Sequence, residues 1–113
     1  MTPQELIAKV LAQRERWVDV GTGKSVKVRR PAETELGRMG RNLTLERLCA
    51  CVVDWRGFTL ADAIGEGDGP IEFDAELWRV LVEDNADWAN TVATAVAEIV
   101  GEYTRNKQAA LGN

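Results

Sequence analysis

The chain has 113 residues, 45% hydrophobic and 28% charged, which gives room for one hydrophobic core and matches the composition of folded domains. It contains no histidine and only two cysteines, which excludes histidine-based catalytic triads and the common tetrahedral zinc sites. The formal net charge of −4 is the sum of +4 over residues 1–60 (11 basic, 7 acidic) and −8 over residues 61–113 (3 basic, 11 acidic).

A helix is predicted over residues 1–15. Thr2 and Pro3 form a favourable helix start, and Glu5 is placed to complete a capping box. Apolar residues then recur at helical spacing and mark one face. These residues are Leu6, Ile7, Val10 and Leu11.

A β-hairpin is predicted over residues 16–30. The runs Trp17–Val20 and Ser25–Arg29 are rich in valine and alternate in polarity, and a segment with two glycines joins them. Gly23-Lys24-Ser25 also resembles the end of a phosphate-binding loop. That motif requires a glycine where Val18 stands, followed by a helix, so we favour a plain hairpin turn over nucleotide binding.

Helices are predicted over residues 31–56. A short one starts at Pro31 and runs through Leu36 and Met39, and the chain breaks at Gly40-Arg41-Asn42. A second, capped by Asn42 or Thr44, is expected to cross the core. Its stripe consists of Leu45, Leu48, Cys49, Val52 and Trp55. Cys49 and Cys51 would point apart on this helix, so we expect two reduced, buried thiols.

Residues 57–73 are predicted to form a glycine-rich loop with a short strand at Ile71–Phe73 that joins the hairpin. Acidic residues gather in this region. They are Asp62, Glu66, Asp68 and Glu72. Their spacing does not match a calcium-binding loop, so no metal site is predicted.

Residues 74–104 are predicted to form two C-terminal helices, the first capped by Asp74, with a break at Asp84-Asn85. Residues 105–113 are expected to fray. The overall expectation is a single α+β domain, mainly helical, with an N-terminal hairpin or small three-stranded sheet packed against helices. Most of the four tryptophans should lie in its core, with one at a partner surface. They are Trp17, Trp55, Trp78 and Trp88.

A basic face is a further candidate site. It would contain Arg29, Arg30, Arg38, Arg41 and Arg47. Nearby glutamates and a sequence pI of about 4.9 argue against nucleic acid as its ligand, so ordinary surface pairing is favoured. The uneven charge along the chain favours head-to-tail self-association, and thus a homo-oligomer, or a partner that carries both signs of charge, or it only maintains solubility. No apolar run approaches the ~20 residues of a membrane span, so we expect no membrane anchor and no export.

Several features in chain order resemble the tail assembly chaperones of long-tailed bacteriophages and prophages. They are the Val18–Val28 hairpin, Arg30-Pro31-Ala32-Glu33, Val52–Gly57, a glycine-rich turn, Pro70–Phe73 and the paired C-terminal helices. The resemblance covers almost the whole chain, although Thr59–Gly69 is longer than the turn usual in that family.

The resemblance implies a non-catalytic protein, without cofactor or metal, in the cytoplasm of the bacterial host. Its partner would be the tape measure protein during tail morphogenesis, with the tail-tube protein as a further candidate. A groove for an amphipathic helix would suffice for this role. The candidate partner-binding residues are Leu77, Trp78, Leu81, Trp88, Val92 and Val96. The alternative for these residues is that they pack on one another.

Two other functions stay open. One is a tail or head completion protein that remains in the virion. The other is a hydrolase that pairs Asp54 with a carboxylate of the acidic loop, which requires a pocket with perturbed carboxylates.

Overall fold

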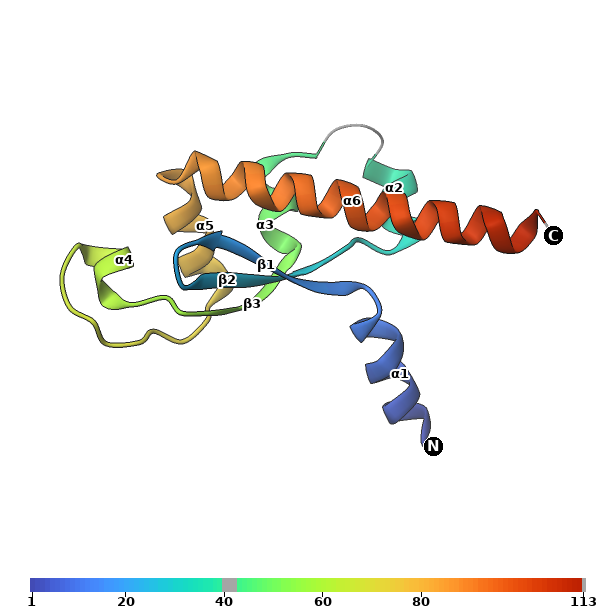
Figure 1. Ribbon diagram of the computed structural model, residues 1–113, viewed down its shortest axis with the longest axis horizontal. Coiled ribbons are helices and arrows are strands. Elements are labelled where there is room, and N and C mark those ends of the chain that lie inside the picture. Colours follow the sequence, from blue (N-terminus) through green and yellow to red (C-terminus); the bar gives the residue numbers. More distant parts are fainter. Residues whose placement is uncertain (40–42, 113) are drawn as a thin grey trace.

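Six helices and three strands make up the part of the chain described by the computed structural model, residues 1–39 and 43–112. The helices are α1 (Pro3–Ala12), α2 (Glu33–Met39), α3 (Leu45–Ala50), α4 (Leu60–Ile64), α5 (Ala75–Glu83) and α6 (Ala86–Leu111). The strands are β1 (Glu15–Gly21), β2 (Lys24–Arg29) and β3 (Val52–Arg56). They form one antiparallel sheet in the order β1-β2-β3, and α6 runs along it (Figure 1). The predicted α+β class is confirmed.

Side-chain caps start three of the helices as the sequence predicts. Thr2, Thr44 and Asp74 each accept a hydrogen bond from the backbone N–H three residues later, at 3.2, 3.2 and 2.9 Å. Such caps satisfy amide groups that a helix leaves unpaired at its first turn. The predicted break at Gly40-Arg41-Asn42, with Asn42 as the alternative cap, lies outside the described residues.

The predicted hairpin is confirmed as β1 and β2, which pair from Glu15 opposite Arg29 to Gly21 opposite Lys24. Its turn places Gly23 at a φ of +74°, in the left-handed region that glycine adopts without strain. The Gly-Lys-Ser sequence therefore belongs to a hairpin turn and the strand that follows it.

The helix predicted through Trp55 ends at Ala50, and Val52–Arg56 is the third strand of the sheet, so this part of the prediction is wrong. The strand is irregular, because Lys27 pairs with Asp54 while Val28 pairs with Val52, which leaves one residue of β3 unopposed. Val52 and Trp55 are both buried and stand three residues apart. This spacing resembles that of a helix.

The loop at 57–73 differs from the prediction in two ways. It contains the short helix α4, and Ile71–Phe73 forms no strand. Instead, Thr59 and Pro70 form an isolated bridge, and the N–H of Ile71 donates to the carbonyl of Phe58 at 3.1 Å. The loop is thereby closed on itself and does not extend the sheet.

The predicted frayed tail is also wrong, because α6 continues to Leu111. Glu33 of α2 accepts hydrogen bonds from the Tyr103 hydroxyl at 2.6 Å and from the Lys107 ammonium at 2.5 Å. These contacts join α2 to the C-terminal half of α6, and Lys, Gln, Ala and Leu in its last turns favour a helix.

An aromatic cluster fills one end of the core. Phe58 stacks on Trp55 at a centroid distance of 4.5 Å and meets Trp88 and Trp78 edge-on at 5.4 and 6.3 Å. The Trp55 indole N–H donates to the carbonyl of Ile71 at 2.9 Å, so the loop is anchored to the same cluster. Cys49 and Cys51 are buried free thiols, as predicted.

Candidate functional site

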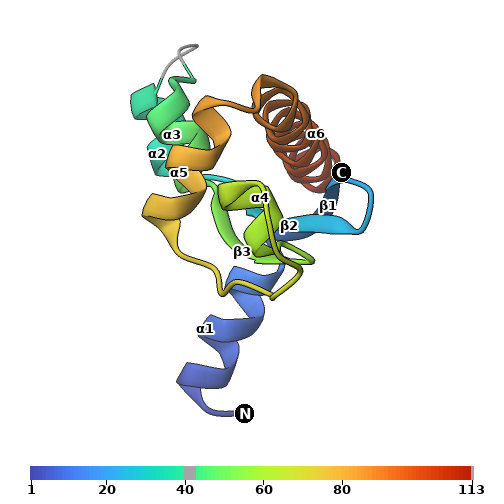
Figure 2. The same ribbon diagram turned by 90° about the vertical axis from the view of Figure 1, so that its left-hand side faces the viewer.

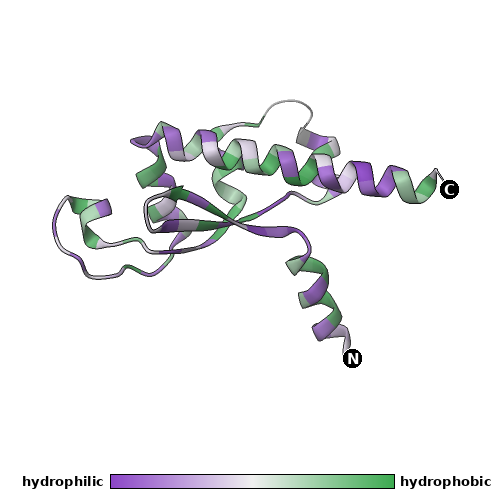
Figure 3. Cartoon of the chain, viewed as in Figure 1, coloured by the Kyte–Doolittle hydropathy of each residue, from purple (hydrophilic) through white to green (hydrophobic). Residues whose placement is uncertain are grey.

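Helix α1 projects from the body of the molecule, and both views show it away from the sheet and from α6 (Figures 1 and 2). None of its residues is buried. Its apolar side chains remain exposed, by 50% for Leu6, 59% for Ile7 and 49% for Val10. Figure 3 shows apolar colouring on this N-terminal helix, which stands apart from the other elements. We call Leu6, Ile7 and Val10 the α1 stripe.

The α1 stripe leads toward a pocket of about 440 Å³ where the end of α1 meets the sheet, α2 and α3. Leu11 lies one helical turn after Ile7 and lines this pocket. Five arginines and one glutamate also line it, so we call it the arginine pocket. They are Arg14, Arg29, Arg30, Arg38, Arg47 and Glu35.

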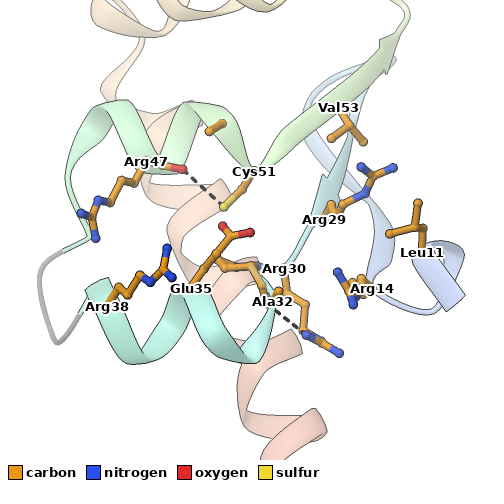
Figure 4. Close-up of a pocket in the computed structure, with 12 residues that line it drawn as sticks. Leu11, Arg14, Arg29, Arg30, Ala32, Glu35, Arg38, Arg47, Cys51 and Val53 are labelled. Atoms are coloured by element: carbon orange, nitrogen blue, oxygen red, sulfur yellow. Dashed lines mark hydrogen bonds between the residues drawn. The ribbon is translucent and has the colours of Figure 1, made fainter.

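The arginines approach the pocket from opposite sides (Figure 4). Arg38 comes from α2 and Arg47 from α3, while Arg29 ends strand β2 and Arg14 and Arg30 directly flank the hairpin. The predicted basic face is therefore largely brought together, with Arg14 added. Its remaining member, Arg41, lies outside the described residues.

Two of these arginines already have partners. Arg29 donates two hydrogen bonds to Glu15, at 3.0 and 2.6 Å. The guanidinium of Arg30 stacks on the Tyr103 ring at 3.8 Å from its centroid and donates to the carbonyl of Pro31. Both side chains are thereby held in place, and their charges are partly satisfied.

The other three arginines have no ion pair or side-chain hydrogen bond with any residue in 1–39 or 43–112. Arg14 is half-buried, whereas Arg38 and Arg47 are exposed at the opposite rim. The carboxylate of Glu35 lies between the two groups of arginines (Figure 4). The pocket thus carries more positive charge than its own carboxylate neutralises.

The floor of the arginine pocket is apolar. Pro31 and Cys51 are buried there, and the Cys51 thiol donates to the carbonyl of Arg47 at 3.4 Å. Burial raises the pKa of Cys51 to about 11, and the charge of Glu35 adds to this shift. The thiol is therefore protonated at neutral pH and is a poor nucleophile.

The structure places the candidate partner residues of the C-terminal helices in the core. Five are buried, and Leu77 is half-buried against them. The buried residues are Trp78, Leu81, Trp88, Val92 and Val96. This placement agrees with the alternative that they pack on one another, and five of the six are not exposed to a partner.

Three of the four tryptophans are buried, as predicted, and Trp17 is half-buried on a face of the sheet. Arg56 lies over the Trp17 ring at 4.1 Å from its centroid, and Lys27 approaches it at 5.5 Å. These cations cover the ring, so Trp17 is a weaker candidate for a partner contact than the α1 stripe.

The residues considered for nucleotide or metal binding have structural partners. Lys24 forms an ion pair with Asp62 at 3.2 Å, and the Ser25 hydroxyl donates to Asp19 at 2.7 Å. Burial raises the pKa of Asp62, but hydrogen bonds from Thr59 and Lys24 outweigh this effect and hold the pKa below its ordinary value. No group of three potential metal ligands occurs within the described residues.

Asp54, the carboxylate considered for hydrolysis, accepts a hydrogen bond from the N–H of Trp55 at 2.9 Å. It lies opposite Lys27 in the sheet register. Its role in the structure is therefore local to the irregular strand β3.

The sequence did not single out Arg14 or the exposure of the α1 stripe. The apolar spacing of α1 was visible, but spacing alone cannot tell whether a helix packs against its own domain or remains uncovered. No helix among residues 1–39 and 43–112 combines the length and apolar character required to cross a membrane. Searches against protein-family models, curated proteins and solved structures found no significant match.

Proposed function

We propose that this protein is a phage or prophage tail assembly chaperone that binds the tape measure protein without catalysing a reaction. The observation that carries the proposal is the α1 stripe, an apolar helical face that no other described element covers. An uncovered amphipathic helix can take up the apolar face of a partner helix. The resemblance in sequence supplies the partner's identity.

The available energy suits reversible binding. Fully burying a leucine, isoleucine or valine side chain contributes about 1.5–3 kcal/mol, and the three stripe residues are each about half exposed. Covering them therefore contributes on the order of 3 kcal/mol. Association itself costs several kcal/mol. A partner must consequently make further contacts, and the arginine pocket lies where the stripe ends.

A non-catalytic role is supported by the surroundings of Glu33 and Asp62, two carboxylates of the described residues whose pKa values are lowered by contacts that hold the fold together. The pKa of Glu33 falls because Lys107 and Tyr103 donate hydrogen bonds to it, and both contacts join α2 to α6. Asp62 caps α4 and pairs with Lys24. In both cases the altered pKa has a structural cause.

The test is co-expression with the tape measure protein encoded nearby, followed by measurement of its solubility and of co-purification. We expect wild-type protein to keep the tape measure protein soluble, and the double variant Leu6→Asp/Val10→Asp to fail. The matched control is Ala8→Asp/Ala12→Asp, which places two charges at the same spacing on exposed positions of the opposite side of α1. Circular dichroism should show that both variants keep the fold.

The proposal is overturned if wild-type protein neither binds nor solubilises the tape measure protein. Loss of binding in both double variants would also remove the assigned role of the stripe. Mass spectrometry of purified virions separates the chaperone from a completion protein, since the chaperone should be absent from the particle.

A further inference from the structure

We propose that the arginine pocket binds carboxylate side chains from an acidic segment of the partner, beside the apolar face that the α1 stripe holds. The identity of the partner rests on the proposed function above. The chemistry of the pocket rests on its own residues.

The first support is the set of guanidinium groups without partners. Arg14, Arg38 and Arg47 line one pocket and pair with no carboxylate in the described part of the chain. A guanidinium presents a planar fork of N–H donors that matches the two oxygens of a carboxylate. Opposed arginines on a single pocket can therefore hold one or two carboxylates between them.

The second support is the surrounding apolar surface. Pro31, Cys51 and Leu11 line the same pocket, and the first two are buried. Charge pairs that form against such a surface are screened less by water than pairs on an open face. The 440 Å³ volume lies within the range of sites that hold a ligand group in a concave surface.

The third support is the position of the pocket at the end of the α1 stripe. An amphipathic helix lying along Ile7 and Val10 would reach Leu11 and then the arginines. The fitting ligand is thus a helix whose apolar face is followed by glutamate or aspartate. Self-association could supply such acidic residues from a second copy, and the test below separates this case.

Nucleic acid fits the site less well. A phosphate backbone needs an extended basic track, whereas these arginines surround one hollow. The net charge of −4 also opposes a polyanion over the rest of the surface. We therefore assign the pocket to an acidic peptide.

The direct test is fluorescence anisotropy of the full chain with a labelled amphipathic peptide that ends in four glutamates. The comparison ligands are the same peptide with glutamines and a single-stranded oligonucleotide. We expect the glutamate peptide to bind best and its affinity to fall as NaCl is raised. Equal binding of the two peptides, or tighter binding of the oligonucleotide, would overturn the assignment.

Variants locate the site. Arg38→Gln/Arg47→Gln should weaken binding of the glutamate peptide about tenfold or more, whereas Arg79→Gln/Arg105→Gln, with the same change in net charge elsewhere, should have a small effect. Glu35→Gln removes the pocket's own carboxylate and should strengthen binding about fivefold, a gain that misfolding cannot produce. If the two double variants weaken binding equally, or if Glu35→Gln weakens it, the pocket is not the site.

The results distinguish failure of the pocket assignment from failure of the proposed chaperone function. If the tape measure protein is not bound but the glutamate peptide is bound through Arg38 and Arg47, only the proposed function is wrong. If the tape measure protein is bound equally well by Arg38→Gln/Arg47→Gln and by wild type, the pocket assignment is wrong. Sedimentation of the protein alone tests the second copy: a dimer that Arg38→Gln/Arg47→Gln dissociates would overturn the assignment to a separate partner.

Discussion

Replacing Gly57 with alanine should destabilise the protein far more than an equivalent change at Gly65. Both glycines have left-handed backbones, with φ of +83° and +81°. An alanine in this region costs about 1–2 kcal/mol through its Cβ alone. The surroundings differ, because a Cβ at Gly65 meets nothing within 4 Å, whereas one at Gly57 would lie 1.8 Å from the carbonyl oxygen of Gly23.

The hairpin turn and the end of β3 must move apart for Gly57→Ala to fit. Real Cβ atoms essentially never approach another heavy atom within 3.0 Å, so the added Cβ and the Gly23 carbonyl oxygen must move apart by at least 1.2 Å, the difference between 3.0 and 1.8 Å. That carbonyl belongs to the turn between β1 and β2, which are paired on both sides of it. We therefore expect Gly57→Ala to lower the free energy of unfolding by about 4 kcal/mol or more.

Urea denaturation followed by tryptophan fluorescence measures the difference. With a slope of about 1.5 kcal/mol per molar urea, the midpoint should fall by about 1 M for Gly65→Ala and by more than 2 M for Gly57→Ala. A Gly57→Ala protein that is unfolded in buffer is consistent with this expectation. Equal midpoints for the two variants would refute the steric reasoning.

Three further predictions concern the core, the α2–α6 contact and the thiols. Phe58→Ala should lower the free energy of unfolding by about 3–5 kcal/mol, because it empties the centre of the aromatic cluster, and a urea-measured loss below about 1 kcal/mol would contradict this. The pKa of Glu33 is lowered in the folded state by the hydrogen bond from Lys107, so its stabilisation is complete above the unfolded pKa and disappears as pH falls through the folded pKa. Glu33→Gln should thus be less stable than wild type at neutral pH and equal to it in acid, and thermal melts that show a constant gap would exclude this linkage. Burial raises the pKa of Cys51 to about 11 and also raises that of Cys49, so at pH 8 roughly one Cys51 thiol in a thousand is a thiolate. Iodoacetamide should label both thiols much more slowly in the folded protein than in urea by mass spectrometry, and equal rates would argue against their burial.

Local signals in the sequence predict much of the fold. Thr2, Thr44 and Asp74 act as caps, and each accepts its hydrogen bond from a backbone N–H only three residues later, so the capping pattern is visible in the sequence. The hairpin is likewise specified by alternation and a glycine-containing turn. In each case the information lies within about ten residues of the element it forms.

The errors come from long-range structure. Val52 and Trp55 have a helix-like spacing only because an irregularity in β3 adds one residue between inward-facing positions, and the pairing with β2 that creates it is remote in sequence. The sequence alone shows no contact that would hold the last turns of α6, whereas in the folded chain Tyr103 and Lys107 donate hydrogen bonds to Glu33. Neither contact leaves a periodic signal.

The arginine pocket, too, is predicted from the sequence in part and revealed in part only by long-range contacts. Four of the pocket's arginines were visible as a basic group, but only the fold shows that Arg14 joins them and that Arg29 is neutralised by Glu15. The residues chosen for partner binding, such as Trp78 and Val92, were chosen for apolar character, and the core uses the same character.

Because α1 has no buried residue, the rest of the molecule imposes almost no packing requirement on its sequence. Amino-acid changes on this helix can accumulate during evolution without lowering the melting temperature. Under the proposed function, substitutions within residues 3–12 would therefore change which partner is bound while the core and the sheet stay unaltered.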